Sequence, residues 1–255
     1  MSAPADDDII LSASGLTKRF GGFAAVNGVD LAVRRGTIHA LIGPNGAGKT
    51  TCFNLLTKFL QPTAGVIRFN GRDITRMAPA DIAGLRLVRS FQISAVFPRL
   101  SVLENVRVAL QRRRGDSFDF WRSDRTLAHF DDEARSRIDD VGLSEFVHHA
   151  AGELPYGRKR ALEIATTLAL DPQMLLLDEP MAGMAQEDVA RTSALIRRIA
   201  ESRTVLMVEH NLSVVADLSD RITVLARGQV LAEGDYDTVS SDPRVIEAYI
   251  GADHA

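Results

Sequence analysis

The sequence predicts an α/β fold in which a parallel sheet carries an N-terminal antiparallel β flap and an inserted α-helical subdomain. Short apolar runs alternate with longer segments of helical periodicity, as in parallel sheets whose strands are joined by helices. The runs that begin at Met174, Val205 and Ile222 are continuous, which is typical of strands covered on both faces. Residues 9–36 and 96–153 interrupt this alternation, and we assign them to the flap and the helical subdomain.

The alternating strands and helices of the parallel sheet follow one another along most of the chain. The expected strands are Ile38–Ile42, Val66–Phe69, Leu87–Ser90, Met174–Leu177, Val205–Val208 and Ile222–Ala226. The expected helices are Lys49–Leu60, Gly157–Ala169, Gln186–Ala200 and Asn211–Leu218. Residues 157–169 show the helical pattern clearly, because their apolar side chains fall on one stripe of the helix.

The other segments complete the predicted organisation. In 9–36, short strands flank a turn at Gly21 and Gly22, which favours an antiparallel flap. In 96–153, Val102–Arg113 is amphipathic and Asp131–Val141 has helical character. We therefore expect one domain, 1–255, that consists of the core with its flap (9–95 and 154–235), the helical subdomain (96–153) and a helical tail (236–255).

Composition excludes several classes of protein. The 255 residues include one cysteine, Cys52, which cannot form an internal disulfide and is expected to be a small buried residue. The 30 basic and 33 acidic residues give a net charge of −3, which does not fit a basic nucleic-acid-binding protein. Met1–Asp8 is acidic where a signal peptide is basic, and no apolar run is long enough to span a membrane. We expect a cytoplasmic protein, and any membrane role must come through a partner.

A phosphate-binding loop lies between the first expected strand and helix of the sheet. Gly43–Thr50, with the sequence GPNGAGKT, fits the pattern G-x-x-x-x-G-K-[ST] in the strand-to-helix context that this motif requires. Its glycines allow the backbone to turn N–H groups toward an anion, and the helix N-terminus adds partial positive charge. Lys49 supplies a full charge at the β- and γ-phosphates, and the Thr50 hydroxyl can bind Mg²⁺. The alternative is a purely structural glycine-rich turn.

Polar residues also follow three other expected strands. Asp178 and Glu179 end an apolar strand, where Asp178 can hold Mg²⁺ and Glu179 can accept a proton from an attacking water. His210 follows another strand and can donate to the γ-phosphate or orient the water. Gln92 follows Leu87–Ser90 and can contact Mg²⁺ or the water. The alternatives are a charged strand end for the acidic pair and structural roles for the other two residues.

The order and spacing of these residues resemble the ATP-binding subunits of ABC transporters, over about Leu11–Gly251. The resemblance implies a P-loop NTPase (RecA-like) core, ATP and Mg²⁺ as ligands, and ATP hydrolysis. It implies Glu179, His210, Gln92 and Lys49 as catalytic residues and Thr50, Gln92 and Asp178 as metal ligands. The nucleotide contacts that it implies are Phe20, Gly43, Pro44, Asn45, Gly46, Ala47, Gly48, Lys49, Thr50, Thr51, Pro155, Tyr156 and Gly157. No N-K-x-D guanine motif is present, so a P-loop GTPase is not favoured.

Two loops depart from the family pattern. Phe20 agrees with the pattern, because it lies where the family stacks an aromatic ring on adenine. The first departure is in Leu154–Arg160, which lies where the family carries the LSGGQ signature. Pro155 replaces the signature serine and Tyr156 replaces a glycine, so that Gly157 alone remains of the signature core. Ala185 replaces the usual aspartate of the D-loop, a short segment after the acidic pair. Because the signature completes the site of the opposite subunit in this family, these departures concern the partner's site.

A finer resemblance is to the LivG-like ATPases of branched-chain amino acid transporters. It rests on Arg89–Gln92, Phe97, Val102–Asn105, the insert Arg112–Phe130, Tyr156-Gly157, Asp178–Met184 and the tail Asp242–Gly251. ATPases for urea, short amides, other amino acids or lipopolysaccharide share many of these features and remain alternatives. A soluble ABC-type ATPase of DNA repair or translation is a further alternative. Such proteins usually have two fused ATP sites or a long coiled coil, whereas this chain has one ATP site and no heptad run in 96–153.

The resemblance also implies partners. ATP is expected to join two such subunits, identical or related, and membrane permease subunits are expected to make contact near Ile93–Leu103. Ala95, Val96, Phe97 and Leu100 would line a groove for a cytoplasmic helix of the permease, or pack within the helical subdomain. A periplasmic substrate-binding protein would act indirectly, and no nucleic acid is expected. The chain would then lie at the cytoplasmic face of the inner membrane as a peripheral subunit.

Overall fold

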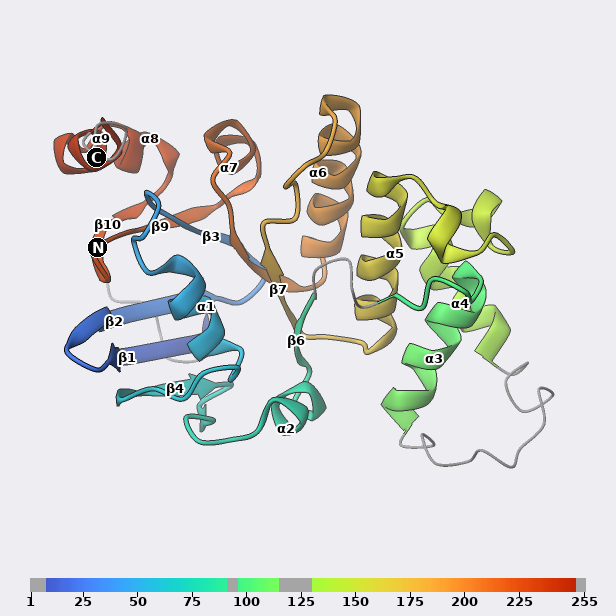
Figure 1. Ribbon diagram of the computed structural model, residues 1–255, viewed down its shortest axis with the longest axis horizontal. Helices are drawn as coiled ribbons and strands as arrows, with labels where there is room; N and C mark the ends of the chain where they lie inside the picture. Colours follow the sequence, from blue (N-terminus) through green and yellow to red (C-terminus); the bar gives the residue numbers. More distant parts are fainter. Residues whose placement is uncertain (1–7, 91–95, 115–129, 251–255) are drawn as a thin grey trace.

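The computed structural model describes residues 8–90, 96–114 and 130–250, which form two sheets and their covering helices (Figure 1). The strands are β1 (Ile9–Phe20), β2 (Phe23–Arg34), β3 (Ile38–Ile42), β4 (Ala64–Phe69), β5 (Arg72–Asp73), β6 (Leu87–Arg89), β7 (Met174–Asp178), β8 (Thr204–Val208), β9 (Arg221–Ala226) and β10 (Gln229–Gly234). One sheet has the order β10-β9-β3-β8-β7-β6 and the other the order β2-β1-β4-β5.

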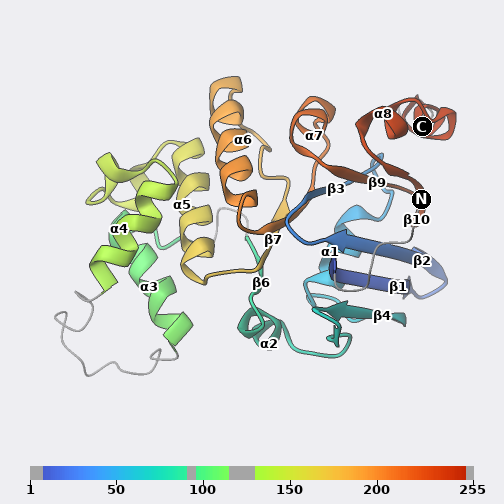
Figure 2. The same cartoon turned by 180° about the vertical axis from the view of Figure 1, so that it is seen from behind.

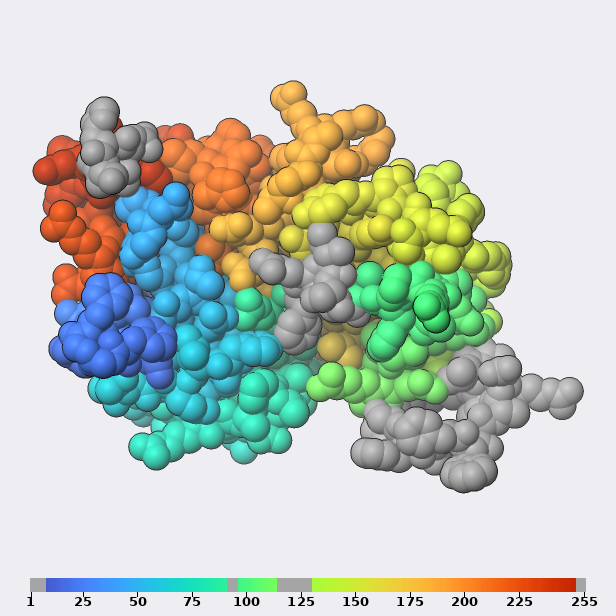
Figure 3. Space-filling model, viewed as in Figure 1, coloured from blue at the N-terminus to red at the C-terminus, as the bar shows by residue number. Residues whose placement is uncertain are grey.

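The helices belong to the core, to the segment around 96–153 and to the C-terminal part. The α-helices are α1 (Lys49–Leu56), α2 (Pro79–Gly84), α3 (Val102–Arg114), α4 (Asp131–Asp140), α5 (Tyr156–Ala169), α6 (Gln186–Ala200), α7 (Leu212–Leu218), α8 (Tyr236–Ser240) and α9 (Pro243–Ile250), with short 3₁₀ turns at Ser144–Phe146 and Ala151–Glu153. In the space-filling view, β1 and β2 lie at one end of the molecule and α3 and α4 at the other (Figure 3).

The six-stranded sheet is parallel from β9 to β6, and β10 pairs antiparallel with β9 at its edge. Its strands alternate between two core clusters: Ile38, Ala40 and Ile42 of β3 enter one cluster, and Leu41 enters the other. Residues of α5, α6 and α7 form the first cluster with the sheet, whereas α1 and the strands β1, β2 and β4 form the second (Figures 1 and 2). Burial on both faces explains the continuous apolar runs.

One sheet assignment from the sequence is wrong. We expected Val66–Phe69 in the parallel sheet, but the corresponding strand β4 pairs antiparallel with β1 in the four-stranded sheet. In β4, Ile67 and Phe69 are buried while Arg68 between them is exposed, which is the alternation of a sheet covered on one face. The run contains too few residues for this alternation to be distinguished from a continuous apolar strand.

The boundaries of some elements also differ from expectation. Helix α1 ends at Leu56 rather than Leu60, because Lys58 has a left-handed backbone with φ 64°. The strands β1 and β2 are long rather than short, and β10 was not expected as a strand. Five of the six residues of β10 are partly exposed and the sixth is exposed, so the segment lacks a strong apolar run.

His39, near the start of β3, is a buried histidine. Its side chain is fully buried, and its Nε2 lies 2.8 Å from Oγ1 of Thr223 on the neighbouring strand. Burial, assisted by the charge of Arg221, lowers the pKa of His39 from 6.5 to about 3. The imidazole is therefore neutral in the folded protein at neutral pH.

This burial makes stability depend on pH. Between the folded and unfolded pKa values of His39 the unfolded chain binds one more proton, so the free energy of unfolding should fall as the pH falls below about 6.5. From pH 7.5 to 5.5, His39 should account for a loss of about 1.4 kcal/mol. His39→Gln keeps a polar group near Thr223 but does not titrate, and its pH-dependent loss in urea unfolding should be smaller by that amount. Equal pH dependence in both proteins would contradict the prediction.

Candidate functional site

The polar residues that the sequence singles out lie at one edge of the parallel sheet. Leu41 of β3 and Asp178 of β7 both pair with Val208 of β8, so the three strands end level with one another. The loop after β3, the acidic pair at the end of β7 and His210 just after β8 therefore meet at the carboxyl edge of the sheet. This is the edge at which parallel α/β proteins bind ligands.

The phosphate loop Gly43–Thr50 is held tightly by its neighbours. A Cβ at Gly43, where φ is 148°, would lie 2.1 Å from the carbonyl oxygen of Leu225, and a Cβ at Gly48, where φ is 97°, would lie 2.4 Å from that of Ala25. Only glycine fits these positions. The carbonyl of Ala47 accepts a 2.9 Å hydrogen bond from the amide of Gly228, which fixes the loop to the turn between β9 and β10.

Lys49 begins α1 and lies across the loop. Its Nζ donates to the carbonyl oxygens of Gly43 at 2.6 Å and Pro44 at 3.0 Å. Burial lowers the pKa of Lys49, and the nearby Glu179 opposes this shift. The ammonium group is thus partly desolvated and held by uncharged carbonyls, so its charge is available to an anionic ligand.

The remaining residues of the loop and of the start of α1 differ in their exposure. Asn45, Gly46 and Thr50 are exposed, whereas Thr51 is half-buried on α1. Cys52 is fully buried, as expected, and burial raises the pKa of its thiol to about 12. The exposed part of the loop, including the Thr50 hydroxyl, therefore faces away from the core, where a phosphate chain can approach.

Asp178 is buried and paired with a residue that we did not predict. Its Oδ2 accepts a 2.7 Å hydrogen bond from Nη2 of Arg89, the last residue of β6. Burial raises the pKa of Asp178, and the charge of Arg89 opposes the shift. In the sequence, Arg89 was visible only as part of the Arg-Ser-Phe-Gln segment of the family, because its partner lies far away along the chain.

Glu179 and His210 form the exposed part of the cluster. The carboxylate of Glu179 is 41% exposed, and its Oε1 lies 3.9 Å from Nδ1 of His210, which is 61% exposed. Glu179 has a left-handed backbone with φ 45°, while its amide donates a 2.9 Å hydrogen bond to the carbonyl of Val208. The side chain of Glu179 is thus far more exposed than that of Asp178, which is 10% exposed, so the two carboxylates can serve different purposes.

Glu209 supports this arrangement from within the core, and sequence reasoning did not single it out. Its side chain is fully buried and accepts hydrogen bonds from the amides of Met181 at 3.0 Å and His210 at 3.1 Å. A third, longer hydrogen bond of 3.4 Å comes from the amide of Asn211. The carboxylate therefore joins the loop after β7 to the loop after β8. The signal for it was a glutamate directly after an apolar strand.

The residues present fit a magnesium–nucleotide ligand. Thr50 and Asp178 offer hard oxygen donors of the kind that Mg²⁺ prefers, and Lys49 offers a cation for phosphate oxygens. In 8–90, 96–114 and 130–250, no three His, Cys, Asp or Glu residues form a metal-binding group. Magnesium is commonly bound by one or two protein oxygens together with substrate phosphates and water.

The other predicted contacts belong to three further segments of the chain. Phe20 ends β1, is 50% exposed and has Nζ of Lys18 5.3 Å from its ring centroid. Gln92 lies outside the described residues. Pro155 precedes α5, which contributes to the core cluster on the opposite face of the sheet from that of α1.

The segment that resembles the signature packs on the D-loop of its own chain. The hydroxyl of Tyr156 donates a 2.9 Å hydrogen bond to the carbonyl of Ala182. Gly157 is buried, and a Cβ there would lie 2.4 Å from the carboxylate carbon of Asp188. Pro155 is exposed. In this arrangement the Tyr156 hydroxyl is already occupied within the chain, while the backbone at the start of α5 lies at the surface beside it.

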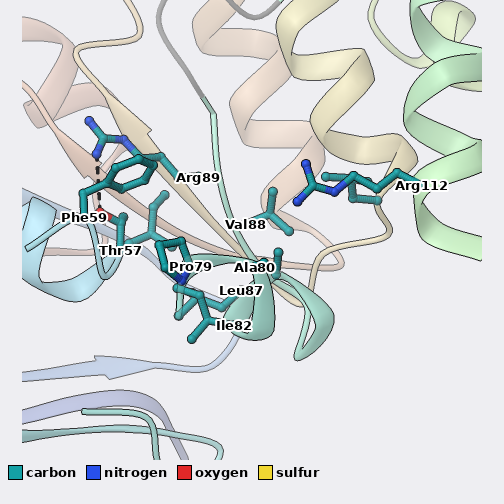
Figure 4. Close-up of a pocket in the computed structure, with 12 residues that line it drawn as sticks. Thr57, Phe59, Pro79, Ala80, Ile82, Leu87, Val88, Arg89 and Arg112 are labelled. Carbon is teal, nitrogen blue, oxygen red and sulfur yellow. Dashed lines mark hydrogen bonds between the residues drawn. The ribbon is translucent and has the colours of Figure 1, made fainter. Parts of the chain in front are cut away.

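An apolar groove lies beside Arg89, between the segment after α1, helix α2 and the end of α3 (Figure 4). It is lined by Thr57, Phe59, Pro79, Ala80, Ile82, Ala83, Leu87, Val88, Arg89, Arg112, Leu170 and Leu176. The ring of Phe59 is 49% exposed and lies next to the guanidinium of Arg89, whereas Arg112 lies at the other side. We name this hollow the Phe59 groove.

The residues that we expected to line a groove do not line this one. Val96 packs against the core cluster of the helical part, and Phe97 is 53% exposed and held through its backbone by Asn105. Leu100 is half-buried, and Ala95 lies outside the described residues. For Val96 the observed packing is the alternative that the sequence left open.

Within the part of the chain that the structure describes, none of the helices is both long enough and apolar enough to cross a lipid bilayer.

Two family models match the chain. Residues 26–182 match the model described as ABC transporter, and residues 229–255 match the one described as branched-chain amino acid ATP-binding cassette transporter. The first match contains the loop Gly43–Thr50 and the pair Asp178 and Glu179. The second contains β10, α8 and α9.

Curated relatives are similar over nearly their whole length. The high-affinity branched-chain amino acid transport ATP-binding protein BraF of Pseudomonas aeruginosa is 41% identical over 252 residues, which cover 95% of this chain and 98% of that protein. The protein LivG of Escherichia coli, described in the same words, is 37% identical with the same coverage. A probable branched-chain amino acid transport ATP-binding protein of Methanocaldococcus jannaschii is 33% identical.

Solved structures share the fold. An ATP-binding cassette of an ABC transporter in its ADP conformation has a TM-score of 0.84 at 31% identity, covering 95% of this chain and 99% of that chain. A nucleotide-free ATP-binding cassette from an ABC transporter gives 0.83 at 30% identity with the same coverage. The predicted P-loop NTPase fold class is therefore confirmed.

Proposed function

The chain belongs to the ABC transporter family of ATP-binding subunits and hydrolyses ATP, and we propose that it powers the import of branched-chain or other hydrophobic amino acids. Its relatives are named for branched-chain amino acid transport, and their similarity extends over 95% of the chain. The observation that carries the cargo assignment is the tail, because residues 229–255 match the model described as branched-chain amino acid ATP-binding cassette transporter.

In the proposed mechanism, Glu179 and His210 act on the attacking water. Glu179 accepts a proton from the water as the water oxygen attacks the γ-phosphorus of ATP in line with the leaving ADP oxygen. His210, whose Nδ1 lies 3.9 Å from Glu179, donates to the γ-phosphate and orients the water. The exposure of both side chains leaves room for the water and the phosphate between the subunits.

The loop and Asp178 hold the phosphates. Lys49 moves its ammonium group from the carbonyls of Gly43 and Pro44 to the β- and γ-phosphates, where it offsets their negative charge. Backbone amides of the loop bind the same phosphates, and Phe20 stacks on the adenine. Thr50, Asp178 and Gln92 would hold Mg²⁺, which would supply further charge neutralisation.

A second ATPase subunit, identical or related, completes each site. The segment Pro155–Gly157 faces the nucleotide of that partner, and ATP joins the two subunits until hydrolysis releases them. The chain lacks the serine hydroxyl of the family signature at Pro155, so backbone amides at the start of α5 supply the contact to the partner's γ-phosphate. The γ-phosphate is therefore the ligand that favours the closed dimer.

The membrane subunits dock at the Phe59 groove and near Ile93–Leu103. The groove is mostly apolar, its Phe59 ring is 49% exposed, and Arg89 in its wall contacts Asp178. A short amphipathic helix of a permease subunit suits such a surface, because its apolar face can cover the ring. In this proposal the chain is peripheral at the cytoplasmic face of the inner membrane, and a periplasmic binding protein delivers the amino acid.

Uptake by cells of the native host tests the proposal. Cells that lack the gene should lose most high-affinity uptake of labelled leucine, isoleucine and valine, and the wild-type gene should restore it. Affinity-tagged chain should be recovered from detergent-solubilised membranes together with membrane-spanning proteins. Phe59→Glu, which places a charge in the groove, should lower that recovery while the isolated chain still binds ATP at saturating Mg²⁺.

Other outcomes separate the alternatives. Unchanged leucine uptake together with reduced uptake of urea or short amides would assign another cargo to the same machinery. Recovery with ribosomes or DNA instead of membrane proteins would indicate a soluble ABC-type ATPase. Full recovery of the Phe59→Glu variant with membrane proteins would move the docking site away from the Phe59 groove.

A further inference from the structure

Arg89 connects the carboxylate of Asp178 with the Phe59 groove through a single side chain. Strands β6 and β7 are paired so that Arg89 lies opposite Leu176, and Asp178 lies two residues further on the same face of β7. Nη2 of Arg89 thereby reaches Oδ2 of Asp178 at 2.7 Å. The two side chains are 16% and 10% exposed, so the pair is largely shielded from water.

The rest of the guanidinium is held by α1 and the residues that follow it. Nη1 donates to Oδ1 of Asn54 at 2.7 Å and to Oγ1 of Thr57 at 3.3 Å. The guanidinium carbon lies 4.9 Å from the ring centroid of Phe53 and 5.1 Å from that of Phe59. Two aromatic rings and two hydrogen bonds therefore fix the position of this cation, with Phe59 as its exposed side.

Resting on the proposed function, we propose that Arg89 is a positioning residue that links the Phe59 groove to the magnesium ligand Asp178. Arg89 acts as a counter-ion with which Mg²⁺ competes for the carboxylate. A permease segment in the groove that displaces the Phe59 ring loosens Arg89 and makes Asp178 a better ligand for Mg²⁺. A segment bound in the groove then changes the affinity of the nucleotide site for Mg²⁺ through Thr57, Phe59 and Arg89 (Figure 4).

The physical basis is the competition of two cations for one carboxylate. Arg89 is paired with one of the two oxygens of Asp178, and a unit positive charge at this distance weakens the attraction of Asp178 for a divalent ion. The competition depends on how firmly the guanidinium is held, and one of the rings that hold it is half-exposed in the groove. Burial of the pair makes the effect stronger than it would be at the surface, because water screens it less.

Magnesium-dependent nucleotide binding by the full chain tests this proposal without a measurement of turnover. A fluorescent ATP analogue is held at fixed concentration in EDTA, Mg²⁺ is titrated in, and the free Mg²⁺ at half-maximal binding is recorded. Arg89→Leu should lower this value by about tenfold, because one competing charge is removed. Arg89→Lys keeps the charge but cannot stack and donate in the same geometry. Its half-maximal Mg²⁺ concentration should lie between those of the wild type and Arg89→Leu.

Phe59→Ala provides a variant that leaves both charges in place. It should lower the half-maximal Mg²⁺ concentration by about threefold in the presence of Arg89, and should have no effect in the Arg89→Leu background. Arg86→Leu is the matched control, because Arg86, directly before β6, forms an ion pair of the same 2.7 Å length with Asp171. It should leave the magnesium dependence unchanged. Thermal unfolding of each variant verifies that it is folded.

The proposal is overturned by an unchanged or raised Mg²⁺ requirement in Arg89→Leu, or by a Phe59→Ala effect of equal size with and without Arg89. If Arg89→Leu does not fold, the Phe59→Ala and Arg89→Lys results decide the question. The wild-type chain is measured first: magnesium-dependent binding in the wild type with no shift in these variants removes only the role of Arg89. No magnesium-dependent binding in the wild type removes the proposed function itself.

Discussion

Glu179→Gln should bind ATP with nearly unchanged affinity and lose almost all turnover. The amide has the size of the carboxylate but cannot accept the proton of the attacking water, so the rate should fall by about 10²- to 10⁴-fold. The half-exposed position of Glu179 means that the substitution costs little stability. Phosphate release by the purified, assembled transporter measures turnover, and equilibrium binding of a labelled ATP measures affinity.

The same substitution should also trap the dimer. Without hydrolysis the γ-phosphate remains in place, and the closed pair of subunits should persist in size-exclusion chromatography with ATP and Mg²⁺. Glu187→Gln is the matched control, since Glu187 is an exposed glutamate at the start of α6, and its turnover should equal that of the wild type. Turnover of Glu179→Gln within a factor of about three of the wild type would remove Glu179 from the role of base.

Lys49→Ala should weaken nucleotide binding by about 10- to 100-fold, because it removes a charge-assisted contact to the phosphates. The isolated chain also uses this ammonium group to hold the carbonyls of Gly43 and Pro44, so the loop should become less ordered in the variant. Titration of a fluorescent ATP analogue into the purified chain measures the dissociation constant.

Lys58→Ala is the control for loss of a buried lysine near the same helix. Lys58 is 3% exposed and donates to the carbonyl of Thr75, away from the phosphate loop. Its removal should lower the melting temperature while the dissociation constant for the nucleotide stays unchanged. A dissociation constant for Lys49→Ala equal to that of the wild type would mean that the loop Gly43–Thr50 does not bind the phosphates.

The sequence was sufficient to place the core of the site because its signals are local. The strand Ile38–Ile42, the glycine-rich loop and the start of α1 are contiguous, and each has its own signal in residue type and spacing. The acidic pair at the end of β7 is found in the same way, because an apolar strand that ends in carboxylates needs no distant partner to be noticed. Parallel pairing of the strands then brings these segments to one edge.

The features that the sequence did not reveal depend on partners far away along the chain. Val66–Phe69 could have belonged to either sheet, since the choice is made by pairing with β1 and not by the run itself. In the sequence, Arg89 is only a polar residue at the end of a strand, and Glu209 is only an acidic residue after a strand. Their importance comes from contacts to Asp178 and Met181, which only the folded chain brings together.

Because Glu179 has a left-handed backbone, with φ 45°, selection for stability and selection for ATPase activity favour different residues at this position. A residue with a Cβ spends about 1–2 kcal/mol to adopt this conformation, whereas glycine adopts it freely and asparagine more easily than most. A laboratory screen for thermal stability alone would therefore favour glycine at this position. The selected subunit would be more stable but would lack ATPase activity. Engineering this ATPase for thermal stability thus needs a parallel screen for ATP hydrolysis.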